Sequence, residues 1–107
     1  MITLKELCEA ANVSRRAIQG YEKEGLIKAS GKNQMGYLLY EEEVISTVET
    51  IRLYQDMGFK VKEIMALESM NETEAKGILV KRKTQLEADI TRKERALKEI
   101  EKLIEEI

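Results

Sequence analysis

Apolar residues near the start of the chain recur with a helical period. Four of them are spaced by three or four residues, which places them on one face of a helix beginning near residue 4: Leu4, Leu7, Cys8 and Ala11. Thr3 and Glu6 have the spacing of a capping box, in which each side chain binds the other's backbone N–H. The pattern therefore predicts a first helix with a defined start.

A second short helix is predicted after Asn12 and Val13 interrupt this period. Ser14 is a good N-cap, because its hydroxyl can accept a hydrogen bond from a free backbone N–H of the first turn. Gly25 is a natural C-terminal stop. The apolar side chains between them fall on one helical face: Ala17, Ile18 and Tyr21. Two short helices joined by a tight turn predict a helix-turn-helix.

A hairpin is predicted over about residues 28–40. Leu26 and Ile27 form a short apolar segment, a polar loop containing Gly31 runs over residues 28–34, and residues 35–40 form a β-rich apolar run. Two short β segments around a glycine-bearing loop indicate a hairpin. Beside a helix-turn-helix, such a hairpin is a wing.

Residues 41–69 predict a second pair of helices. Three glutamates at 41–43 favour a helix N-terminus through the helix dipole. The third helix ends by Gly58, and its apolar positions have helical spacing: Val44, Ile45, Val48, Ile51 and Tyr54. The fourth helix has its own apolar set: Val61, Ile64, Met65 and Leu67. The expected fold is mainly α, with a winged helix-turn-helix domain over residues 1–70.

The strongest period lies in residues 71–107. Asn71 to Glu74 form a capping signature, and seven aliphatic residues then follow a heptad with alternating steps: Leu79, Leu86, Ile90, Leu97, Ile100, Ile104 and Ile107. Lys76, Lys83 and Lys93 occupy the remaining seam positions. Residues 76–107 would extend about 48 Å as a helix, too long for a small domain to cover. The pattern predicts a coiled coil through which the chain forms a homodimer.

The amino-acid composition argues against several classes of function, including metal binding and catalysis. The 107 residues include no His, no Pro, no Trp and one Cys, which leaves no internal disulfide and no metal cluster. No cofactor is expected. Catalysis is not expected either, because the glutamates at 41–43 are consecutive on a helix, point in different directions and cannot converge on one substrate. No apolar run is long enough to span a membrane and no leader precedes residue 1, so a cytoplasmic location is expected.

Charge gives a weak indication of a nucleic-acid surface. The net charge is −2, but residues 1–40 carry six basic and four acidic side chains, a balance of +2. Arg15 and Arg16 open the second helix, where cations are unfavourable to the helix dipole. Their position suits contact with bases and phosphates. These two arginines are therefore the main candidates for contact with double-stranded DNA.

Other candidates leave two interpretations open. Ser14 is first a helix cap and second a candidate for phosphate contact. Tyr21 has a ring near the inner face and a hydroxyl that could reach a phosphate. Tyr37 and Tyr40 alternate on the wing strand, so either packing or DNA contact could explain each. The remaining candidates are polar groups at the wing tip and basic residues of the second helix pair, all consistent with phosphate contact or with ordinary solvation: Lys32, Asn33, Arg52, Lys60 and Lys62.

Together, these segments resemble the MerR family of transcriptional regulators. The resemblance lies in motifs that occur in the family's order and spacing: residues 2–7, 12–18, 21–27, 36–40 and 51–64, which read ITLKEL, NVSRRAI, YEKEGLI, GYLLY and IRLYQDMGFKVKEI. It implies that the second helix enters the major groove and the wing grips the flanking backbone. It also implies an antiparallel coiled coil holding two heads on a pseudo-palindromic promoter operator, with RNA polymerase as a further candidate partner.

Four positions depart from the family's pattern, and three of them lack a basic residue that is usual there. The family's Arg-Tyr-Tyr-Glu is Gln19-Gly20-Tyr21-Glu22 here, so Gln19 stands where a DNA-contacting arginine is usual. Leu38 replaces the wing arginine, and Gln55 stands where a basic residue is common. Because phosphate contacts carry salt-dependent affinity, weaker or narrower DNA binding is expected.

The sequence thus predicts a homodimeric, sequence-specific DNA-binding regulator. The alternative is an adaptor of the chaperone-modulator type, which keeps the head but binds another protein instead of DNA. The missing basic residues and the acidic total favour this alternative. The Tyr21–Ile27 and Gly36–Tyr40 motifs favour DNA.

Overall fold

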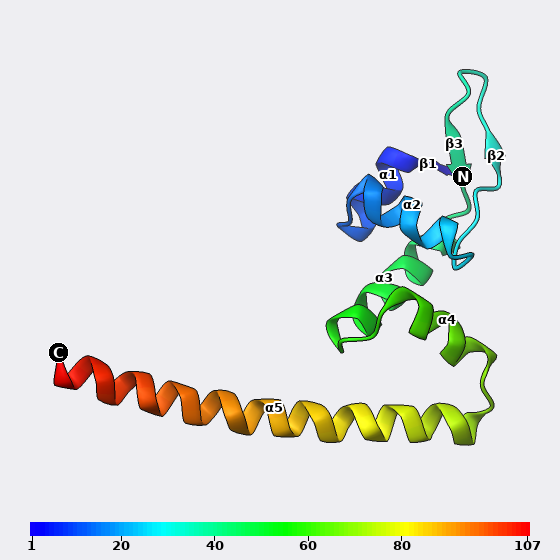
Figure 1. Cartoon of the computed structure of the whole chain (residues 1–107). Coiled ribbons are helices and arrows are strands. Elements are labelled where there is room, and N and C mark those ends of the chain that lie inside the picture. The colour runs from blue at the N-terminus through cyan, green and yellow to red at the C-terminus, as the bar shows by residue number, and fades with distance from the viewer. The chain divides into compact units, whose positions relative to one another are not determined.

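The computed structural model describes residues 1–107, and the chain divides into two compact units. Met1–Ser69 form the first unit, which we call the head, and Met70–Ile107 form the second. The head contains four helices and a small sheet, whereas the second unit is a single long helix, α5 (Glu72–Glu106) (Figure 1).

The predicted helix-turn-helix is confirmed as α1 (Leu4–Ala11) and α2 (Arg15–Lys23). The capping box is also present, because the Glu6 N–H donates to Thr3 Oγ1 over 3.2 Å and the Thr3 N–H donates to Glu6 Oε1 over 3.1 Å. Asn12 ends α1 in the left-handed region at φ 54°. Ser14 Oγ accepts from the Ala17 N–H over 3.1 Å and caps α2.

Gly25 ends α2, as the sequence predicted. Its φ of +80° is unfavourable for residues with a Cβ atom. The Gly25 N–H donates to the Glu22 carbonyl over 3.0 Å, and the Leu26 N–H donates to the Tyr21 carbonyl over 2.9 Å. These bonds satisfy carbonyls that would otherwise lack a partner at the helix end.

Two glycines of this segment provide a stability test with opposite expected signs. A Cβ atom at Gly20, inside α2, would meet nothing within 4 Å, so we expect Gly20→Ala to raise the free energy of unfolding by about 0.5–1 kcal/mol. A Cβ atom at Gly25 would lie 3.2 Å from Met65 Cε and would require the left-handed conformation. We therefore expect Gly25→Ala to lower that free energy by about 1–2 kcal/mol. Urea denaturation at one chain concentration measures both, and a change of the same sign and size in the two variants would contradict these roles.

The sheet differs from the predicted hairpin. It contains β1 (Ile2–Thr3), β2 (Gly31–Lys32) and β3 (Leu38–Tyr40), in the order β1-β3-β2 with antiparallel pairs. The strand expected at Leu26 and Ile27 is wrong, because Ile27 instead lies in the core as part of an irregular segment. β2 falls inside the predicted loop, where two exposed residues give no apolar pattern.

The wing turn is built around the Asn33 side chain. Asn33 Oδ1 accepts from the Met35 N–H over 2.9 Å and from the Tyr37 N–H over 3.0 Å. Gly36 completes the reversal at φ +83°. β2 and β3 thus project from the head as a narrow hairpin (Figure 1).

The hydrophobic core lies entirely in the head. Helix α3 (Glu43–Asp56) and helix α4 (Val61–Ser69) pack with the helix-turn-helix around it. The Tyr54 and Phe59 rings meet edge to face with their centroids 6.0 Å apart. Six of the buried residues come from α1 to α4, and Ile27, Tyr40 and Phe59 come from outside these helices. The six are Leu7, Ile18, Tyr21, Val48, Ile51 and Ile64.

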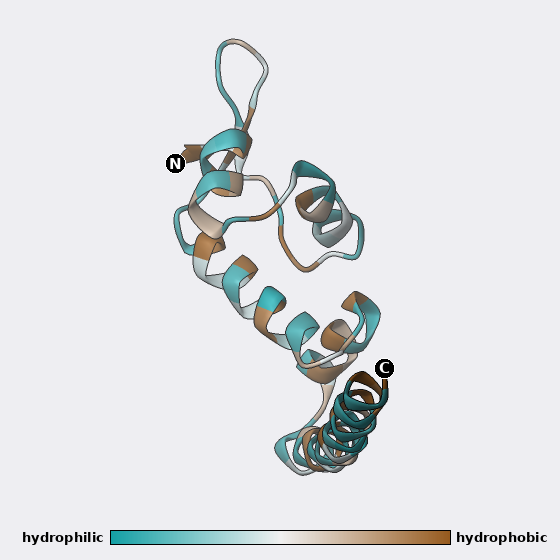
Figure 2. Cartoon of the chain, turned by 90° about the vertical axis from the view of Figure 1, so that its left-hand side faces the viewer, coloured by the Kyte–Doolittle hydropathy of each residue, from teal (hydrophilic) through white to brown (hydrophobic).

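Helix α5 buries none of its own side chains. Asn71 caps it, with Oδ1 accepting from the Glu74 N–H over 2.9 Å. Ile90, Leu97 and Ile104 are 57%, 60% and 66% exposed, and hydrophobic turns recur among hydrophilic ones along the helix (Figure 2). No helix of the chain combines the length and the apolar character that a membrane span requires.

Candidate nucleic-acid interface

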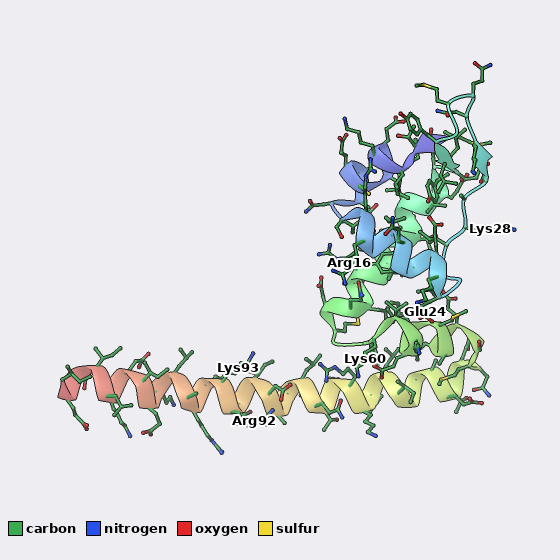
Figure 3. The ribbon with its side chains drawn as sticks, turned by 45° about the horizontal axis from the view of Figure 1, so that its top comes forward. Arg16, Glu24, Lys28, Lys60, Arg92 and Lys93 are labelled. Atoms are coloured by element: carbon green, nitrogen blue, oxygen red, sulfur yellow. The ribbon has the colours of Figure 1, made fainter.

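Arg15 and Arg16 are exposed at the start of α2. The Ser14 cap fixes this helix end, so both side chains leave the head from a defined position. Figure 3 shows Arg16 projecting from α2, on the side of the head opposite Lys28. The ion pairs of the chain, Arg92–Asp89 and Lys102–Glu99, both lie in α5. The two arginines therefore remain available for an anionic partner.

Tyr21 and Arg52 make contacts inside the head. The Tyr21 side chain is 2% exposed, and its hydroxyl donates to Gln55 Oε1 over 2.7 Å. Burial raises the pKa of this phenol. Arg52 Nη1 donates to the Asn12 carbonyl over 3.1 Å, which ties α3 to the turn of the helix-turn-helix. Tyr21 thus ties α2 to α3, and Arg52 ties the turn after α1 to α3, roles that their spacing in the sequence did not reveal.

The structure separates the two wing tyrosines. Tyr37 is 58% exposed, whereas Tyr40 is fully buried. The Tyr40 hydroxyl donates to Glu22 Oε1, and burial, followed by the Glu22 hydrogen bond, raises the Tyr40 pKa. Tyr40 therefore belongs to the hydrophobic core, which is the packing alternative for this residue.

The raised pKa of Tyr40 predicts a loss of stability at alkaline pH. The folded head favours the neutral phenol, so its contribution is fully present below pH 10, the ordinary tyrosine value, and falls as pH rises above it. We expect the free energy of unfolding to decrease between pH 9.5 and 11 by up to about 1.4 kcal/mol per pH unit for this group. Denaturation of the parent and Tyr40→Phe proteins measures this, and identical pH dependence in the two would contradict it.

The remaining candidates are mostly exposed polar groups. Gln19, Lys32 and Lys60 are exposed, and the backbone N–H of Lys60 donates to Glu63 Oε1 over 3.0 Å. Lys62 is also exposed. Asn33 is half-buried, with its carboxamide oxygen engaged in the wing turn.

A hollow of about 630 Å³ adds a residue that the sequence did not single out. Lys5 lines it together with Arg15 and residues of the wing. Lys5 lies in the first turn of α1, and only the folded head brings it beside the second helix and the hairpin. Its sequence position alone gives no signal for this site.

The fold and the site define a winged helix-turn-helix protein with unpaired arginines at the start of its second helix. This architecture places the second helix for nucleic-acid contact. Residues 2–70 match the model of the MerR HTH family regulatory proteins. The chain belongs to this family, and it is therefore a member of a family of DNA-binding transcription regulators.

Known proteins support this assignment along the whole chain. An uncharacterised HTH-type transcriptional regulator of Synechocystis is 27% identical over 110 residues, covering 100% of this chain and 77% of its own length. The nodulation protein NolA of Bradyrhizobium elkanii is 37% identical over 59 residues, covering 55% of this chain. The chain spans only 27% of NolA's length.

A solved structure shares the fold. HiNmlR, described as a MerR family regulator lacking the sensor domain and bound to promoter DNA, has a TM-score of 0.69. The match covers 92% of this chain and 83% of that one, at 16% identity. At this identity the likeness concerns the fold alone.

Proposed function

We propose that this protein is a homodimeric, sequence-specific transcription regulator that binds a pseudo-palindromic operator in promoter DNA in the cytoplasm. The observation that carries the proposal is the pair of exposed arginines, Arg15 and Arg16, at the capped start of α2. Residues at this end of a recognition helix contact base edges and backbone phosphates of the major groove. RNA polymerase at the same promoter is a proposed second partner.

The proposed DNA contacts are the exposed members of the predicted set. Arg16 and Gln19 would meet base edges in the major groove. Arg15 at the edge of that groove, Lys32 and Tyr37 on the wing, and Lys60 before α4 would meet the backbone. Ser14 would act mainly as the cap of α2. Tyr21, Asn33 and Arg52 would support the interface from behind, because their polar groups already bind within the head. HiNmlR, which has the same fold, is described as bound to promoter DNA, and this supports DNA as the partner.

The proposed dimer uses the apolar seam of α5. A helix with an aliphatic heptad and no buried side chain gains stability by covering that seam with a second helix. An antiparallel pair relates the two chains by a twofold axis, which suits an operator with inverted half-sites. Residues 71–107 would therefore be the dimerisation segment.

A gel shift with DNA from upstream of the protein's own gene tests the proposal against the adaptor alternative. We expect a retarded band that unlabelled upstream DNA competes away more effectively than a scrambled duplex of the same length. An adaptor that binds only protein would leave both duplexes unshifted at low salt. No shift, or equal competition by both duplexes, would contradict sequence-specific binding.

A further inference from the structure

Two cationic side chains stand among the largely apolar residues that line the hollow between α1, α2 and the wing. Lys5 from α1 and Arg15 from α2 supply two cations, and Tyr37 from the wing supplies an exposed phenol. No carboxylate lines this hollow. The nearby Glu6 carboxylate is held back by the Thr3 backbone and hydroxyl groups, both of which donate to Glu6 Oε1. The hollow therefore has the chemistry of an anion site.

The position of Lys5 is unfavourable for α1 itself. Thr3 is the N-cap, so Lys5 lies in the first turn, where a positive charge opposes the helix dipole. The Thr3 cap already accepts from the Glu6 N–H, but the Leu4 and Lys5 N–H groups have no acceptor within the helix and add to the attraction for anions. Thr3 and Leu4, which carry this helix start, line the same hollow.

Leu38 lines the hollow as well. This is the wing position at which the resemblance to the family leads one to expect an arginine, and a leucine there cannot bind a phosphate. Lys5 lines the same hollow from α1. It therefore supplies a positive charge at the site where Leu38 of the wing supplies none.

We propose that Lys5, together with Arg15 and Tyr37, binds a backbone phosphate of the DNA duplex, and that Lys5 replaces the missing wing arginine. This inference rests on the proposed function. A phosphate held between α1, α2 and the wing fixes the head on the duplex without reading bases. The contribution of Lys5 is therefore the same on specific and non-specific DNA.

The test measures binding to two duplexes, one selected from a random pool and one scrambled, at several salt concentrations. For Lys5→Gln we expect about tenfold weaker binding to both duplexes. The slope of log K against log salt should become shallower by about 2, because a dimer loses two phosphate contacts. Lys5→Arg should keep the parent affinity and slope, and Lys98→Gln on α5 is the matched control for lost charge.

A double variant tests the replacement itself. Lys5→Gln combined with Leu38→Arg should regain the parent salt slope, provided that its thermal unfolding matches that of the parent. Unchanged affinity and slope in Lys5→Gln would overturn the inference while leaving the proposed function intact. Failure of the unsubstituted protein to bind either duplex would overturn both.

Discussion

Replacing Arg15 and Arg16 together with alanine is expected to abolish sequence-specific DNA binding while leaving the folded dimer intact. Each arginine is exposed and forms no ion pair in the head, so its removal costs the fold little. Loss of a base or phosphate contact by an arginine costs about 1–3 kcal/mol of binding free energy. Two such losses in each of two heads total at least about 4 kcal/mol, which weakens binding by about a thousandfold or more. Fluorescence anisotropy with a labelled operator duplex measures the change.

The matched control removes the same charge from another part of the chain. Arg95→Ala with Lys98→Ala deletes two cations from outward positions of the α5 heptad. We expect this variant to keep operator affinity within about threefold, since long-range screening weakens distant charges. Retained affinity in the Arg15 and Arg16 variant would refute their assignment as the principal contacts.

Leu97→Glu in α5 is expected to convert the protein from a dimer to a monomer. Leu97 is 60% exposed in the single chain and occupies a seam position of the heptad. In the paired helices, the new carboxylate would be buried without a partner, which costs several kcal/mol. Sedimentation velocity at micromolar chain concentration measures the change in mass.

Thr91→Glu provides the control for this second prediction. It adds the same charge to α5 at a position that the heptad turns away from the seam. We expect it to remain dimeric and to bind the operator as the parent does. A Leu97→Glu protein that still sediments as a dimer would show that the aliphatic seam does not join the chains.

The helices were predictable because their signals are local. The Thr3 and Ser14 caps, the Gly25 stop and the heptad of α5 each depend on neighbours within a few residues. The sheet was harder to predict, because β1 and β2 are two residues each and pair through backbone groups that carry no sequence pattern. Ile27 shows the same limit, since its apolar side chain fits an irregular buried segment as well as a strand.

Only those residues of the candidate site that lie at the start of α2 could be predicted from the sequence, because the N-cap itself fixes their exposure. Arg15 and Arg16 lie where the Ser14 cap places them. In contrast, the internal roles of Tyr21 and Arg52 depend on Gln55 and Asn12, which are 34 and 40 residues away in sequence. Lys5 and the wing likewise meet only across the folded head. Contacts of this kind depend on packing, and residue type alone cannot indicate them.

Selection of bound duplexes from a random-sequence pool tests most directly whether paired heads read one operator. Because two heads related by a twofold axis read one duplex, the enriched sequences should contain two inverted half-sites, and the complex should contain two chains per duplex. Enrichment of no common sequence, or a complex of one chain with one unrepeated site, would contradict recognition by a twofold dimer.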